Sequence, residues 1–104
     1  MFIIDSHQHF WKYDPLEHSW ITDDMSAIRR DFLPETLKAV LHKNNVQGCI
    51  AVQTAQTLAE TNYLLELGSA HKFIKGVVGW INLTSPTLEK YLEIYAEGPL
   101  LKGF

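Results

Sequence analysis

Long apolar runs, a secretory leader and blocks of like charge are all lacking in this sequence. No apolar run approaches the roughly 20 residues that a membrane-spanning helix needs. The first residues, 1–5, have neither the cationic region nor the small-residue cleavage site of a signal peptide. With 9 basic and 12 acidic residues, the chain has no basic footprint for nucleic acid. We therefore expect a cytoplasmic protein without a membrane or nucleic-acid partner.

Cysteine is also scarce, because Cys49 is the only one among 104 residues. An intrachain disulfide is therefore excluded. Cys49 stands in an apolar run, where a small thiol packs well, so we predict that it is buried. Hydrophobic residues make up 46% of the chain, which is enough for the modest core of a single globular domain.

Short runs rich in strand-forming residues recur along the chain. The predicted strands cover residues 2–5, 48–53, 73–81 and 100–104. Each run is apolar and short, as is typical of strands that are buried in a parallel sheet.

Between these strands lie three segments with helical periodicity and recognisable start signals. Pro34 suits a first helical position, and that helix is expected to end at residues 44–45. Thr57 and Glu60 have the spacing of a capping box, in which each side chain satisfies a backbone amide of the other residue, before a helix that ends near Gly68. The pair at residues 85–86, Ser-Pro, predicts the start of the third helix.

The resulting order of strands and helices predicts an α/β fold with parallel strands and right-handed crossover helices. The first connection is exceptional, since about 28 residues, 6–33, precede the first helix where about 2 to 6 are usual. A loop of that length commonly covers a functional site.

Two histidines follow the first predicted strand, at positions 7 and 9. Side chains two positions apart on a strand point to the same side, so both imidazoles can reach one metal ion. Taken alone, this spacing also fits two histidines that merely contact solvent or hydrogen-bond partners.

The residues around the histidine pair resemble a known family. The resemblance lies in segments 5–11, 13–15, 20–21, 31–35, 52–56, 60–61 and 76–80, and so covers nearly the whole chain. The sequence is similar to the amidohydrolase superfamily, in the amidohydrolase-related (amidohydrolase 2) group that includes sugar-acid lactonases such as fuconolactonase and rhamnonolactonase.

This resemblance implies the N-terminal part of a (β/α)8 TIM barrel, with about three and a half βα units in a single domain that spans 1–104. It also implies that His7 and His9 bind a divalent ion, usually zinc, although some members of the group work without metal. A full barrel needs about 250 residues, so we expect a truncated barrel whose catalytic base lies beyond Phe104. Such a chain would expose strand edges and could form a homo-oligomer.

Other side chains are candidates for substrate binding. They occur in the long first loop or follow the second and third strands: Trp11, Tyr13, His18, Trp20, Gln53 and Trp80. The aromatic groups could line a pocket for a sugar-like substrate, or they could pack the loop against itself. Gln53 could donate to a substrate oxygen or cap a loop, and Trp80 could instead belong to the core.

The expected function is metal-dependent hydrolysis of a sugar-acid lactone or similar cyclic ester. Two alternatives stay open at this point. One is a metal-dependent decarboxylase of the same superfamily. The other is a non-catalytic barrel fragment or assembly module that retains an ion-binding pair.

Overall fold

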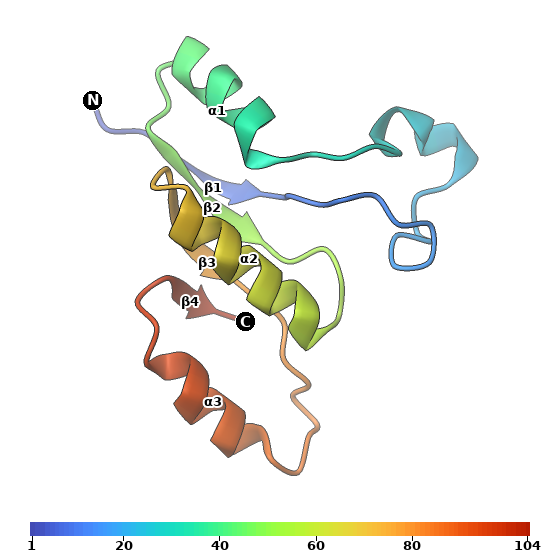
Figure 1. Ribbon diagram of the computed structural model, residues 1–104, viewed down its shortest axis with the longest axis vertical. Coiled ribbons are helices and arrows are strands. Elements are labelled where there is room, and N and C mark those ends of the chain that lie inside the picture. Colours follow the sequence, from blue (N-terminus) through green and yellow to red (C-terminus); the bar gives the residue numbers. More distant parts are fainter.

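The computed structural model describes all residues 1–104. It contains four parallel strands and three α-helices (Figure 1). The strands lie in one sheet in the order β1-β2-β3-β4, so each strand is added beside the one before it. Their bounds are β1 Ile4–Gln8, β2 Gly48–Val52, β3 Ile74–Val78 and β4 Leu101–Gly103. The helices are α1 Pro34–Lys43, α2 Leu58–Ala70 and α3 Leu88–Ala96. The predicted alternation of parallel strands and crossover helices is confirmed.

The first strand lies further along the chain than its apolar pattern predicts. β1 includes His7 and ends at Gln8, whereas residues 2–3 precede it with exposed side chains. Pairing with β2 sets this limit, because the ladder starts with Ile4 opposite Gly48. His7 is therefore part of the strand itself rather than of the following loop.

β1 also contains an irregularity in its pairing with β2. Asp5 lies opposite Cys49 and Gln8 lies opposite Ala51, so three steps along β1 match two steps along β2. Bulges of this kind are common beside functional sites because they change the direction of the next side chains. Here the change falls between Asp5 and Gln8, at the histidine pair.

The third strand is shorter than predicted. β3 ends at Val78, so Gly79 and Trp80 lie beyond the strand instead of inside it. β2 ends at Val52, which places Gln53 just after its carboxyl end. The two candidate residues, Gln53 and Trp80, therefore lie just beyond the carboxyl ends of neighbouring parallel strands.

The α1 helix agrees with its sequence signals. Pro34 occupies the first turn, where its missing N–H is not needed. At the other end, Asn45 has a φ of 58°, a left-handed conformation that stops the helix and that asparagine tolerates well.

The start of α2 confirms half of the predicted capping box. The Thr57 hydroxyl accepts a hydrogen bond from the backbone N–H of Glu60 at 3.1 Å. The Glu60 carboxylate does not return to Thr57, and instead accepts hydrogen bonds from residues 54–55. The helix ends at Ala70, two residues beyond the Gly68 near which its end is expected.

The α3 helix begins at Leu88 rather than at the predicted Ser85-Pro86 pair. The Ser85 hydroxyl accepts a hydrogen bond from the N–H of Thr87 at 3.2 Å, which forms a local turn before the helix. Such side-chain bonds to nearby backbone compete with helical geometry. The proline therefore stands in this turn and not in the first helical position.

The hydrophobic core lies between the sheet and α2. It consists of six buried side chains from the β1 end, β2, α2 and β3: Phe10, Cys49, Ala51, Leu64, Ile74 and Val77. Cys49 is completely buried and free of any disulfide, as predicted. The core thus fixes the strand ends from which the candidate site residues project.

The long first loop is ordered by contacts within itself. Trp11 and Phe32 form an antiparallel bridge, with backbone N–H to carbonyl distances of 3.0 and 2.8 Å. A 3-10 helix, Asp23–Ile28, lies inside the loop and was not predicted. The bridge joins the two ends of the loop close to the start of α1. The residues between Trp11 and Phe32 therefore form a loop that projects from the sheet (Figure 1).

Candidate functional site

The two imidazoles at the end of β1 face each other. The Nε2 atoms of His7 and His9 lie 3.2 Å apart, with the ring centroids 4.8 Å apart. Two nitrogens that bind one zinc ion tetrahedrally at about 2.0 to 2.1 Å would lie about 3.3 Å apart. The separation in this chain fits a shared ion.

A hydrogen bond from the neighbouring strand orients His9. Its Nδ1 atom lies 2.9 Å from the carbonyl oxygen of Val52, the last residue of β2. A carbonyl oxygen can only accept, so Nδ1 carries the proton and donates. In the neutral ring this leaves the Nε2 lone pair directed toward His7, which is the tautomer that a metal ligand requires.

Asp5 braces the other side of the histidine pair. Its carboxylate accepts from the backbone N–H of His7 at 3.0 Å and from the side-chain amide of Gln8 at 3.0 Å. These bonds hold the irregular part of β1, between Asp5 and Gln8, in which His7 lies. The direction of the His7 ring thus depends on residues within the same strand.

The chain brings two imidazoles to this position. Residues 1–104 contain no group of three or more histidine, cysteine or carboxylate side chains that could hold a metal ion. Tetrahedral zinc sites have four ligands, of which three come from protein in catalytic sites. His7 and His9 therefore fit part of a metal site.

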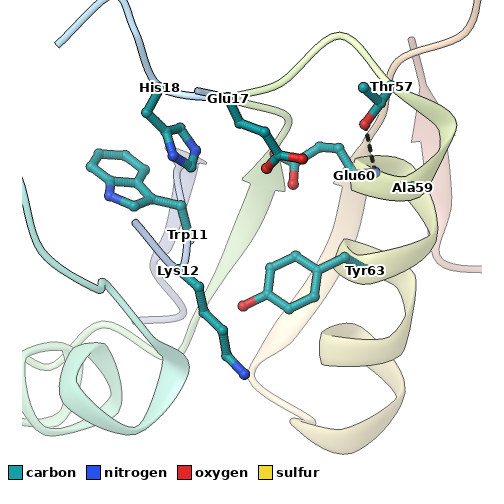
Figure 2. Close-up of a pocket in the computed structure, with 8 residues that line it drawn as sticks. All are labelled: Trp11, Lys12, Glu17, His18, Thr57, Ala59, Glu60 and Tyr63. Atoms are coloured by element: carbon teal, nitrogen blue, oxygen red, sulfur yellow. Dashed lines mark hydrogen bonds between the residues drawn. The ribbon is translucent and has the colours of Figure 1, made fainter. Parts of the chain in front are cut away.

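The first loop and the start of α2 line an open pocket of about 230 Å³ (Figure 2). Its lining comes from positions far apart in the sequence: Trp11, Lys12, Glu17, His18, Thr57, Ala59, Glu60 and Tyr63. Only Trp11 and His18 of this set were predicted as site residues. The α2 members were missed because packing, rather than spacing along the chain, brings them to the loop.

Tyr63 contributes an unpartnered hydroxyl group to this region. Its phenol oxygen is buried and has no hydrogen-bond partner. Burial raises the pKa of Tyr63, and the nearby carboxylates of Glu60, Asp31 and Glu35 raise it further. The phenol is therefore held in its protonated form.

The aromatic residues of the first loop divide into buried and exposed members. Trp11 is buried and donates its indole N–H to the Arg30 carbonyl at 2.9 Å. His18 is 2% exposed and stacks against Tyr13. Trp20 is 47% exposed and contacts the edge of Trp11. Trp11 and His18 thus organise the loop, whereas Trp20 leaves much of its ring accessible.

Gln53 and Trp80 follow β2 and β3, and their backbones are fixed by neighbours. The Gln53 N–H donates to the Val78 carbonyl at 2.9 Å, and its half-buried side chain makes no hydrogen bond within the chain. Trp80 is held through both its backbone N–H and its carbonyl by the hydroxyl of Thr61. Sequence reasoning did not identify Thr61 in this role.

Comparisons with known proteins agree with this geometry. No family model matches the chain. It is 40% identical to an L-fucono-1,5-lactonase of Burkholderia multivorans over 97% of this chain and 34% of the relative. It is 36% identical to an L-fucono-1,5-lactonase of Burkholderia ambifaria over 98% of this chain and 35% of the relative. The chain thus spans about a third of the length of these relatives.

Solved structures give the same result. The chain superposes over its full length on an amidohydrolase from Burkholderia multivorans with bound zinc, with a TM-score of 0.90 and 40% identity. A second structure of an amidohydrolase from this organism, with bound HEPES, gives a TM-score of 0.93 and 38% identity. In each case 36% of the solved chain is covered.

Four parallel strands, crossover helices and a histidine pair at the end of the first strand define the N-terminal part of a TIM barrel with a candidate metal site. Over almost its whole length the chain is similar to about a third of an amidohydrolase of known structure and of two L-fucono-1,5-lactonases. The resemblance seen in the sequence is confirmed.

Proposed function

We propose that the complete protein containing this chain is a metal-dependent hydrolase that opens a lactone of a sugar acid. The observation that carries the proposal is the 3.2 Å approach of the His7 and His9 Nε2 atoms, with His9 held by Val52. The names of the relatives, both L-fucono-1,5-lactonases, support the substrate class.

In this proposal His7 and His9 hold a divalent ion, with zinc as the first candidate. A bound zinc ion supplies Lewis-acid chemistry at a carbonyl and activates water at neutral pH. The contribution of this chain is to present two imidazole nitrogens close together in fixed directions. Hydrogen bonds to Asp5 and to the Val52 carbonyl hold these directions within the chain, as partners that orient metal ligands do in metal sites.

The substrate contacts follow from position and exposure. Trp20 offers an accessible ring face that suits the apolar face of a sugar, and the Gln53 amide is free to donate to a substrate oxygen. Trp80 follows β3 at the same end of the sheet. The buried Trp11 and His18, with the half-buried Tyr13, shape the loop that carries Trp20.

The relatives' names favour lactone opening over the two alternatives, decarboxylation and a non-catalytic module. No helix of this structure is long and apolar enough to span a membrane. A cytoplasmic location, the absence of a nucleic-acid partner and homo-oligomer formation remain predictions.

The proposal is tested on the complete purified protein by metal analysis and by acid release from L-fucono-1,5-lactone. We expect the protein to contain at least about one equivalent of zinc. Chelation should abolish lactone turnover, and added zinc should restore it. His7→Ala and His9→Ala should each lower the metal affinity by at least about tenfold and remove most turnover.

His42→Ala serves as the matched control. His42 is an exposed residue in the last turn of α1, so its loss should leave zinc content and turnover unchanged. Full turnover in the metal-free protein, or normal activity of both histidine variants, would contradict the proposal.

A further inference from the structure

Two adjacent residues of α2, Glu60 and Thr61, hold two different strand-end loops. Glu60 contacts the segment after β2, and Thr61 contacts the segment after β3. These segments carry Gln53 and Trp80. One turn of α2 is therefore connected to two of the loops at the candidate site, although neither residue belongs to a strand end itself.

The Glu60 contact is made by one carboxylate oxygen. It accepts from the Thr54 N–H at 2.7 Å, the Thr54 hydroxyl at 2.8 Å and the Ala55 N–H at 3.3 Å. Hydrogen bonds to an ionised acceptor are about twice as strong as neutral ones. The segment held in this way begins directly after Val52, whose carbonyl orients His9. Glu60 thus anchors the residues that follow Val52 in the chain, and so restricts where the Val52 carbonyl can lie.

The Thr61 contact satisfies both backbone groups of one residue. The Thr61 hydroxyl accepts from the Trp80 N–H at 2.7 Å and donates to the Trp80 carbonyl at 2.7 Å. Thr61 is fully buried, so loss of its hydroxyl would leave the Trp80 backbone groups without these partners.

Gly79 makes this approach possible. A Cβ atom at position 79 would lie 2.6 Å from the Thr61 Cγ2 atom and 2.8 Å from its hydroxyl oxygen, closer than real Cβ contacts. Only glycine allows the Thr61 side chain to lie this close to the backbone before Trp80. Thr61, Gly79 and Trp80 therefore form one matched contact.

We propose that Glu60 and Thr61 are positioning residues of the proposed active site, Glu60 for the metal ligand His9 through the loop after β2, and Thr61 for substrate binding through Trp80. This inference rests on the proposed function. According to this inference, α2, which packs against the sheet, fixes the positions of His9 and Trp80 at the strand ends.

The Thr61 role is tested by kinetics of Thr61→Val and Thr61→Ser in the complete protein. Valine keeps the shape of the side chain and removes the hydroxyl. KM for the lactone should rise about tenfold with kcat little changed, because Trp80 is proposed to bind the substrate equally before and during the reaction. Serine keeps the hydroxyl and should restore KM to within about threefold. A Thr61→Val protein with lowered Tm but normal KM would overturn the role.

Gly79→Ala provides a second route to the same contact if Thr61→Val does not fold. It retains the Thr61 hydroxyl and forces it away from Trp80. The expected rise in KM is the same, and an unchanged KM in this variant would count against the proposal.

The Glu60 role is tested by zinc affinity in Glu60→Ala and Glu60→Gln. Alanine removes the anchor, so zinc should dissociate about tenfold more readily, in the range found for partners that orient metal ligands. Glutamine retains an acceptor oxygen and should recover much of the affinity. Glu66→Ala is the matched control, because Glu66 is exposed on the same helix. Equal zinc affinity in Glu60→Ala and Glu66→Ala would overturn the role.

Failure of the proposed function can be told apart from failure of this inference. Wild-type protein that neither binds zinc nor opens lactones contradicts the proposed function. Amide hydrogen exchange tests the two contacts independently of activity: Thr61→Val should speed exchange at Trp80, and Glu60→Ala should speed exchange at Thr54. Unchanged protection at both amides would overturn the inference.

Discussion

The Nδ1 atom of His9 lies 2.9 Å from the Val52 carbonyl oxygen, so the end of β2 determines the direction of a ring that follows β1. The same ring presents its Nε2 atom to His7 at 3.2 Å. A pair of histidines close in sequence thus depends on a residue more than forty positions away, since the contact joins positions 9 and 52. This relationship connects the parallel sheet with the chemistry proposed for its edge.

Trp20→Ala should raise KM for the lactone with a smaller effect on stability. The Trp20 ring is 47% exposed, and an aromatic contact of about 1.4 kcal/mol corresponds to a tenfold change in binding. Kinetics and thermal melting of the complete protein measure both effects. Leu16→Ala, at an 87% exposed position in the same loop, should change neither. An unchanged KM in Trp20→Ala would remove Trp20 from the substrate site.

Cys49 should be unreactive in the folded protein. Burial raises the pKa of its thiol from 9.0 to about 11, and the Asp5 carboxylate adds to the effect. At pH 8 a two-unit rise lowers the thiolate fraction about a hundredfold, and burial slows reagents further. Labelling with a thiol reagent before and after denaturation measures the difference. Equal rates in the two states would contradict the burial of Cys49.

The same shift predicts how stability depends on pH. Because the folded pKa is raised, the folded state retains the proton, and the stabilisation is fully present below pH 9. It is lost as the pH rises from about 9 toward about 11. Denaturant unfolding at pH 8 and pH 10.5 should therefore show a decrease that Cys49→Ala reduces. A decrease of the same size in both proteins would assign the effect to other groups.

Gly48→Ala should destabilise the sheet. A Cβ atom there would lie 2.5 Å from the Phe73 carbonyl oxygen, and backbone in the middle of a sheet cannot move away cheaply. We expect a loss of about 1 to 3 kcal/mol in the free energy of unfolding, as for other overpacked sites. Gly98→Ala is the control, since the nearest atom to its added Cβ is the Tyr95 carbonyl oxygen at 3.8 Å, an ordinary van der Waals contact. Equal stability of the two variants would contradict this account of β2 packing.

Much of the fold follows from local patterns. The apolar runs and helix start signals predict the order of elements, because strand and helix periodicities differ. The limits of β1 do not follow from them, since pairing with Gly48 rather than hydrophobicity decides where the strand starts. Likewise, Ser85 makes a local turn that shifts the start of α3. In both cases hydrogen bonds outweigh the side-chain pattern.

The candidate site is only partly visible in the sequence. The spacing of His7 and His9 predicts a shared position, and the structure brings their nitrogens together. The Val52 carbonyl leaves no trace in the sequence, because every residue has one. Glu60 was read as part of a capping box, but its carboxylate turns to the preceding loop. Such contacts depend on how the loop after β2 meets α2 in space.

The most direct test of the shared histidine site is a crystal structure of the complete protein grown with zinc, with the ion located by anomalous scattering. We predict one ion within about 2.0 to 2.1 Å of both the His7 and His9 Nε2 atoms, with the Val52 hydrogen bond to His9 preserved. Zinc bound elsewhere in this crystal, or imidazoles of His7 and His9 that point apart, would contradict the account.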